Sequence, residues 1–179
     1  MCNGEEMIKH AVFGEIRKIR EGWAAVGMTE KGLACLCLPQ KTLQEAKEIL
    51  CERLAPRNIH FNSRFAPAEK ILDLIEGYFN GEVKDFPIPL DPVNGSEFDR
   101  SVWDGARRIA YGETKTYAWL ASRIRRSGAA RAVGGALGRN PLPIVIPCHR
   151  IIRSDGGLGG FGAGLPWKRR LLELEARFR

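Results

Sequence analysis

The sequence Pro143-Ile144-Val145-Ile146-Pro147-Cys148-His149-Arg150-Ile151-Ile152 is the most informative stretch of this 179-residue chain. Its β-branched residues favour a strand, and Pro147, which has no amide hydrogen, restricts that strand to a sheet edge or an irregular segment. A cysteine in such a run is commonly an inert core residue. The imidazole and guanidinium that follow Cys148 favour a second interpretation, because neighbouring positive charge activates a thiol as a nucleophile.

Charge is distributed unevenly along the chain, whose net charge is +7. Residues 1–96 hold 12 basic and 14 acidic residues, a net of −2, whereas residues 97–179 hold 16 and 7, a net of +9. The sign changes just after the proline-rich stretch 86–95, which is typical of an extended linker. We therefore expect a supporting domain over residues 1–90, a linker to about residue 95, and a second domain over residues 96–179. The basic second domain suits a polyanionic partner, although a solvated basic surface would carry the same charge.

The composition narrows the class of protein. The apolar fraction of 44% and the charged fraction of 27% are those of an ordinary soluble protein. No apolar run approaches the roughly 18 residues of a membrane span, and the acidic start does not resemble a secretion signal. Five cysteines without a framework spacing indicate a reducing compartment. We expect the protein in the cytoplasm, or in the nucleus of a eukaryotic cell.

Short strands and helices are predicted in the first domain. Residues 11–38 are apolar and interrupted by glycines, which predicts several short strands. A helix is predicted over residues 42–54, where Thr42 and Glu45 have the spacing of a capping box. A second helix is predicted from about Pro67 to Phe79.

A Cys-x-Cys pair, Cys35 and Cys37, lies at the end of the strand-rich region. It lacks the Cys-x-x-Cys spacing of zinc ribbons and fingers, so two core cysteines are the better interpretation, and we expect no cofactor. A structural zinc ion would need further ligands, for which the sequence offers Cys2, His10, Cys51 and His60.

The second domain is predicted to be mainly helical. Caps such as Ser96 and Thr116, and the spacing of apolar residues, predict helices over residues 97–109, 117–124, 129–138 and 166–178. The second and third are short and separated by a glycine-containing break, which resembles a helix-turn-helix. The third has almost no side-chain bulk apart from Arg131. Because each glycine costs a helix about 1 kcal/mol, we interpret this helix as one whose backbone another surface approaches closely.

The segment Gly157-Leu-Gly-Gly-Phe-Gly162 matches the glycine pattern of dinucleotide-binding loops. Such a fold also needs a second parallel strand and an acidic residue about 20 positions further on. The sequence after Gly162 is too short to supply them, so a flexible or ligand-contacting loop is the better interpretation.

Several segments together closely resemble the methylated-DNA–protein-cysteine methyltransferases, also called O6-alkylguanine-DNA alkyltransferases. They are Tyr111–Tyr117, Ala130–Ala136, Asn140–Arg150, which contains Pro-Cys-His-Arg, and Gly164–Glu175. The resemblance implies an α+β fold, with a small N-terminal α/β domain (a ribonuclease H-like sheet plus helices) and a mainly helical, winged helix-turn-helix-like alkyltransferase domain. It also implies DNA repair by irreversible transfer of an alkyl group from O6-alkylguanine, and from O4-alkylthymine, in duplex DNA to Cys148, once per protein molecule.

The resemblance assigns four catalytic residues. On a strand, Cys148 and His149 would point to opposite faces, so direct proton transfer between them is not expected. The resemblance instead implies a relay from Cys148 through a water molecule to His149 and Glu175, with Glu175 orienting the imidazole. Tyr117 matches the family tyrosine that donates a proton towards guanine and lines its pocket.

The resemblance also assigns contacts with DNA. The target atom lies within the base stack, so the nucleotide must be flipped out, and Arg131 would fill the vacated space from a helix in the minor groove. Asn140 matches the hinge between this helix and the active-site strand. The other implied positions are Ala129, Ala130 and Gly134 for DNA binding, and Pro143, Ile151, Ser154, Gly159, Phe161, Gly162 and Lys168 for the substrate pocket. The expected partner is double-stranded DNA containing O6-alkylguanine, bound by a monomer, with no membrane involved.

Two other functions remain open on the sequence alone. A helix-turn-helix regulator or lesion-flagging module would bind DNA without forming a covalent product, but base reading requires longer side chains than the helix over residues 129–138 offers. A cysteine hydrolase or redox sensor would show many turnovers or reversible oxidation, and it leaves the basic half unexplained.

Overall fold

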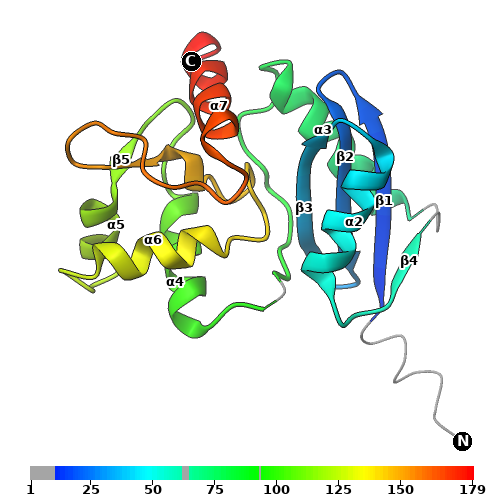
Figure 1. Ribbon diagram of the computed structural model, residues 1–179, viewed down its shortest axis with the longest axis horizontal. Coiled ribbons are helices and arrows are strands. Elements are labelled where there is room, and N and C mark those ends of the chain that lie inside the picture. Colours follow the sequence, from blue (N-terminus) through cyan, green and yellow to red (C-terminus); the bar gives the residue numbers. More distant parts are fainter. Residues whose placement is uncertain (1–10, 62–64, 93) are drawn as a thin grey trace, which may run out of the picture. The chain divides into compact units, whose positions relative to one another are not determined.

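The computed structural model describes residues 11–61, 65–92 and 94–179. The chain divides into two compact units, residues 1–93 and 94–179 (Figure 1). The first contains a sheet with two helices and the second is mainly helical, which confirms the predicted α+β class. No helix in the described ranges has the length and apolar character needed to cross a bilayer.

The N-terminal unit is built on a four-stranded sheet of order β3-β2-β1-β4. Strands β1 to β3 form an antiparallel meander, and β4 pairs in parallel with β1. The strands are β1 (Val12–Ile19), β2 (Gly22–Thr29), β3 (Gly32–Gln40) and β4 (Ile59–Phe61).

Two amphipathic helices cover the sheet. Helix α2 (Leu43–Leu54) begins with the predicted capping box of Thr42 and Glu45, and it packs its buried residues onto one face of the sheet. Helix α3 (Ala66–Phe79) buries an apolar stripe behind the strands in the view of Figure 1. Both helices lie within one residue of their predicted bounds.

The proline-rich stretch runs along the edge strand β3. The Leu33 amide donates to the Pro89 carbonyl at 3.0 Å, and the Asp91 amide donates to the Leu33 carbonyl at 2.9 Å. Gly32 permits this approach: its φ is +154°, and a Cβ there would collide with the Pro89 carbonyl. Residues 86–92 of the stretch are therefore extended, as predicted, and are held in place by β3.

The C-terminal unit places its helices around a short segment that carries the cysteine. The Ser96 and Thr116 caps are observed, each accepting a hydrogen bond from the first turn of its helix. The elements are α4 (Glu97–Arg107), β5 (Lys115–Thr116), α5 (Tyr117–Arg123), α6 (Ala130–Gly138), the 3₁₀ helix η1 (Cys148–Arg150), β6 (Ile151–Ile152) and α7 (Leu165–Arg177).

The strand predicted over residues 143–152 is wrong for most of its length. Only Ile151–Ile152 pairs with another strand, β5, while Cys148–Arg150 forms η1. Pro143 and Pro147 have no amide hydrogen for a ladder, and the Ile146 carbonyl accepts from the Asn140 side chain at 2.9 Å and not from a neighbouring strand. The β-branched residues are buried, but in an irregular segment.

Helix α6 is attached to α4 by two polar contacts. The indole nitrogen of Trp103, a residue that is 1% exposed, donates to the Ala136 carbonyl at 2.9 Å. Arg139, just after α6, donates to the Asp99 carboxylate through Nη2 at 2.6 Å and through Nε at 3.3 Å. Since Asp99 also caps α4, one carboxylate fixes the start of α4 and the end of α6.

We expect Trp103→Phe to lower the free energy of unfolding of this unit by about 1–3 kcal/mol, because it removes a buried hydrogen bond and leaves a small cavity. Urea denaturation followed by circular dichroism would measure the loss. The matched control is Trp119→Phe, since Trp119 is 36% exposed and surface changes usually stay within about 0.5 kcal/mol. Equal effects of the two substitutions would contradict the contact.

Candidate active site

Cys148 is buried at the start of η1, where its residue is 6% exposed. The Asn140 side chain donates through Nδ2 to the Cys148 Sγ atom at 3.0 Å and to the Ile146 carbonyl. The Asn140 Oδ1 atom accepts from the Leu142 amide at 2.9 Å, which fixes the orientation of the side-chain amide. A donor held against sulfur in this way favours the thiolate.

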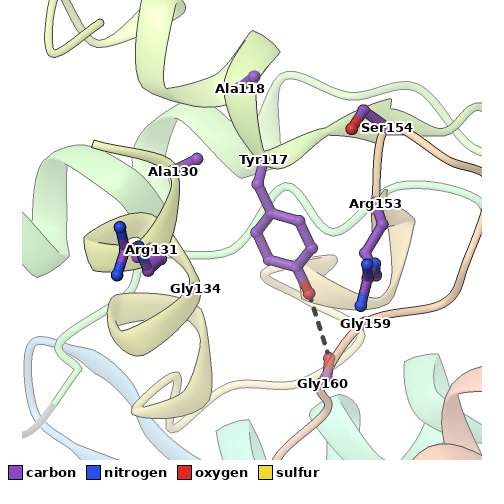
Figure 2. Close-up of a pocket in the computed structure, with 9 residues that line it drawn as sticks. All are labelled: Tyr117, Ala118, Ala130, Arg131, Gly134, Arg153, Ser154, Gly159 and Gly160. Carbon is purple, nitrogen blue, oxygen red and sulfur yellow. Dashed lines mark hydrogen bonds between the residues drawn. The ribbon is translucent and has the colours of Figure 1, made fainter. Parts of the chain in front are cut away.

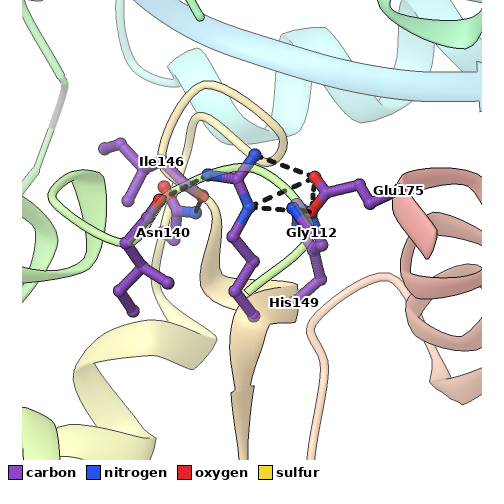
Figure 3. A network of polar contacts seen from close by, with 7 residues as sticks. Gly112, Asn140, Ile146, His149 and Glu175 are labelled. Carbon is purple, nitrogen blue, oxygen red and sulfur yellow. Dashed lines mark hydrogen bonds and ion pairs between the residues drawn. The ribbon is translucent and has the colours of Figure 1, made fainter. Parts of the chain in front are cut away.

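His149 and Glu175 form a buried pair beside the cysteine. The His149 Nε2 atom lies 2.8 Å from the Glu175 Oε1 atom, and both side chains are at most 1% exposed. The same carboxylate accepts from Arg150 through Nη2 at 2.8 Å and Nε at 2.9 Å, and from the Gly112 amide at 3.0 Å. These contacts bring η1, the turn before β5, and α7 together (Figure 3).

Burial and the neighbouring charges determine which side chains of this cluster are protonated. Burial raises the pKa of Glu175, but the hydrogen bonds from His149 and Arg150 outweigh that effect and hold the pKa at about 2. Burial lowers the pKa of His149 below its usual 6.5, although Glu175 opposes the shift. At neutral pH the carboxylate is therefore charged and the imidazole neutral. Because a carboxylate only accepts, the proton is on Nε2, and Nδ1 is the basic nitrogen.

Arg150 does not supply the positive charge that its position after Cys148 suggested. Its Nε and Nη2 atoms bind Glu175, and its Nη1 atom donates to the Ile109 carbonyl at 2.6 Å. No local pattern predicts this role, because Glu175 lies 25 residues away on another element. In the described part of the unit, Arg150 therefore balances the Glu175 carboxylate.

Lys168 supplies a cation near the thiol. It is fully buried, and its Nζ atom donates to the carbonyls of Ile151 at 2.5 Å, Gly160 at 3.3 Å and Leu158. Burial lowers the pKa of Lys168 to about 8, while the negative charge of Cys148 opposes that shift. Lys168, expected in the outer wall of the pocket, thus ties the loop after β6 to α7.

A cavity of about 410 Å³ opens between α5, α6 and the loop after β6. Tyr117 projects into it between Arg131 and Arg153, and the Tyr117 hydroxyl donates to the Gly160 carbonyl at 3.4 Å (Figure 2). Burial and then the charge of Cys148 raise the pKa of Tyr117, so the phenol is protonated at neutral pH.

Glycines on both sides make room for Tyr117. Gly159 has a φ of +68°, and a Cβ there would lie 2.6 Å from the tyrosine oxygen. A Cβ at Gly134 would lie 3.6 Å from the ring, in ordinary contact. The glycine-rich loop therefore needs a glycine at position 159, whereas α6 would tolerate a small side chain at position 134.

The structure brings six of the sixteen predicted site residues together in the cavity wall. The wall contains Tyr117, Ala130, Arg131, Gly134, Ser154 and Gly159, and also Gly160, which lies in the segment 154–163 that the resemblance matches to the outer wall of the pocket. Ala118 and Arg153 complete the wall, and the sequence did not indicate them. Cys148, His149, Glu175, Asn140 and Lys168 lie in the polar cluster described above. The others lie outside the wall: Ala129 precedes α6, Pro143 and Ile151 are buried, Phe161 is half-buried and Gly162 is exposed.

Cys35 and Cys37 lie in the core beneath α2. Burial raises the pKa of Cys35 to about 12 and that of Cys37 to about 11, which disfavours the thiolates that zinc requires. Among the residues that the structure describes, no group of three metal-ligating side chains is present. Cys2 and His10, offered as further ligands, lie outside the described residues.

We expect the free energy of unfolding to fall as the pH drops from about 6.5 towards 2. Glu175 has a lowered pKa, so its contribution is complete above its ordinary value of 4.5 and is lost as the pH falls through about 2. His149 also lowers the free energy of unfolding below pH 6.5. Its imidazole takes up a proton at a higher pH in the unfolded chain than in the folded one, so protonation favours unfolding. In Glu175→Gln, unfolding should cost about 3–5 kcal/mol less at pH 7, because Arg150 is left buried without its partner.

Urea denaturation at a series of pH values would measure both effects. The decline between pH 4.5 and 2 should be shallower in Glu175→Gln than in the parent protein. Glu173→Gln, an exposed change on the same helix, is the matched control and should leave the profile unaltered. A Glu175→Gln profile parallel to that of the parent would show that the cluster is assigned wrongly.

Comparison with known proteins agrees with the geometry. A family model described as the DNA-binding domain of 6-O-methylguanine DNA methyltransferase matches residues 97–177. A methylated-DNA–protein-cysteine methyltransferase of Haemophilus influenzae is 48% identical over 126 residues, which are 69% of this chain and 70% of that relative. One from Mycobacterium bovis is 42% identical over 120 residues, 67% of this chain and 72% of that relative. The crystal structure of Mycobacterium tuberculosis OGT in complex with DNA has a TM-score of 0.77 at 32% identity, covering 93% of this chain and 94% of that one. With its fold, its cysteine site and these relatives taken together, the chain belongs to the methylated-DNA–protein-cysteine methyltransferase family.

Proposed function

We propose that the protein repairs DNA by moving an alkyl group from O6-alkylguanine, and from O4-alkylthymine, in duplex DNA to the Sγ atom of Cys148. The observation that carries this proposal is the buried Cys148 sulfur, which accepts a hydrogen bond from Asn140 in a family named for its cysteine acceptor. The cavity into which Tyr117 projects, about 410 Å³, is large enough for a purine base and a small alkyl group, and the charge of Cys148 acts on that tyrosine.

The proton of the thiol leaves through His149. In a 3₁₀ helix consecutive side chains lie about 120° apart, so Cys148 and His149 are not on opposite faces, as they would be on a strand. A water molecule then carries the proton from Sγ to Nδ1 of the neutral imidazole, while Glu175 stabilises the imidazolium through Nε2–H. Asn140 and Lys168 stabilise the thiolate that remains.

The thiolate attacks the alkyl carbon. The S–C bond forms as the C–O6 bond breaks, and the electron pair passes to the purine. Tyr117, whose raised pKa keeps it protonated, donates a proton to the departing guanine and regains one from the relay. The net change is one thiol and one alkylguanine converted to one thioether and one guanine. No cofactor is required, since Cys148 itself accepts the alkyl group.

A thioether is not readily cleaved, so each molecule reacts once. The base must leave the stack to reach Cys148, at a cost of a few kcal/mol. Arg131 is exposed on α6 and lines the cavity, which supports the proposal that it enters the space left in the duplex. The small side chains around it let the α6 backbone approach a minor groove closely.

Intact-protein and peptide mass spectrometry would test the reaction. After incubation with a duplex containing one O6-methylguanine, the protein should gain one methyl group, located on Cys148, with saturation at one per molecule. Cys148→Ala should gain none and should still bind the duplex. Tight binding of the lesion by the parent protein without a mass change would instead indicate a lesion-flagging module.

Arg131→Ala should slow repair of duplex DNA on the order of tenfold or more. Flipping the base out costs a few kcal/mol, and without the Arg131 side chain in the vacated space that cost is no longer offset. Its reaction with free O6-benzylguanine should be nearly unchanged, since that base needs no extrusion. Arg123→Ala, an equal loss of charge on an exposed face of α5, should have a much smaller effect on the duplex. If Arg131→Ala slowed both substrates equally, the role in extrusion would be refuted.

A further inference from the structure

Arg153 occupies the wall of the cavity opposite Arg131 (Figure 2). It follows β6 directly, and its backbone is held by a tight turn. The Arg153 amide donates to the Gly157 carbonyl at 2.8 Å, and the Gly156 amide donates to the Arg153 carbonyl at 3.1 Å. The turn fixes the point from which the long side chain reaches the cavity.

The charges around the cavity mouth favour an anion. Its wall contains two arginines, Arg131 and Arg153, and no aspartate or glutamate. The side chain of Arg153 is 63% exposed, and its Nη2 atom pairs with Asp155 Oδ2 at 2.8 Å. Asp155 is itself exposed, and its other oxygen accepts from the Gly157 amide at 2.9 Å. Arg153 therefore keeps donors available in its planar fork.

We propose that Arg153 binds the phosphate adjoining the extruded nucleotide, with Asp155 as its partner until DNA arrives. This inference rests on the proposed function. When the base of the extruded nucleotide enters the cavity, its 5′ and 3′ phosphates stay at the cavity mouth, because both are still bonded to the neighbouring nucleotides of the duplex. The guanidinium fork matches phosphate oxygens, and such charge-assisted pairs are the strong ones. Arg153 is thus a binding residue for the lesion nucleotide.

The test is a cycle that combines protein and DNA changes. Arg153→Gln is assayed with a duplex containing O6-methylguanine in which the 5′ or the 3′ phosphate of that nucleotide is, in turn, a neutral methylphosphonate. Each change alone should slow alkyl transfer on the order of tenfold, as loss of one charged hydrogen-bonded pair implies. At one of the two phosphates the combined change should slow it no further. The rate with free O6-benzylguanine should be unaffected.

Two variants serve as controls. Arg169→Gln removes the same charge from an exposed position on α7 outside the cavity wall, and its effect should multiply with that of either methylphosphonate. Asp155→Asn keeps an oxygen for the Gly157 amide while releasing Arg153, so it should speed the reaction of the duplex two- to fivefold, on the scale of a surface ion pair.

Several outcomes would overturn the inference. If Arg153→Gln and the methylphosphonate slowed alkyl transfer by factors that multiply at both phosphates, Arg153 would contact neither phosphate. Equal slowing of duplex and free base would show that Arg153 only shapes the cavity, and equal weakening of undamaged duplex binding would indicate a general backbone contact. Failure of the parent protein to methylate Cys148 would refute the proposed function itself, which the same mass measurement distinguishes.

Discussion

The C-terminal unit depends on the hydrogen bonds that the carboxylate of Glu175 accepts. Glu175 lies near the end of the last helix, yet it accepts hydrogen bonds from His149, Arg150 and the Gly112 amide. A buried carboxylate is costly unless its oxygens are satisfied, so the docking of α7 and the shape of η1 stabilise each other. The segment that carries Cys148 is held by charge and hydrogen bonding where a regular sheet would use a backbone ladder.

Two cationic side chains have different roles near Cys148: Arg150 is close to it in the sequence and Lys168 in space. Arg150 neutralises Glu175, while burial and then the charge of Arg150 keep His149 uncharged and able to accept a proton. Lys168 donates to a carbonyl group of β6 and to one in the glycine-rich loop, and its charge interacts with that of Cys148. The loop that walls the cavity and the electrostatic environment of the thiol therefore depend on one side chain.

Local signals predicted much of the structure. The caps at Thr42, Ser96 and Thr116 set helix starts to within a residue, because capping is decided by a few neighbouring groups. The segment around Cys148 was predicted as a strand, since β-branched composition cannot reveal that the Asn140 side chain would occupy the Ile146 carbonyl. Motif resemblance pointed to His149 and Glu175, whose side chains lie 2.8 Å apart, but the place of Arg153 in the cavity wall depends on tertiary structure, which no local pattern encodes.

The proline-rich stretch has a consequence for solubility. Strand β3 is at the edge of its sheet, where unpaired backbone groups would invite another chain to add as a further strand. The segment around Leu90 covers that edge at Leu33, and its neighbours Pro87, Pro89 and Pro92 have no amide hydrogens to offer to an incoming chain. The proline-rich stretch thus also protects the edge of the sheet from aggregation. A truncated first unit that ends before residue 86 would lose that protection.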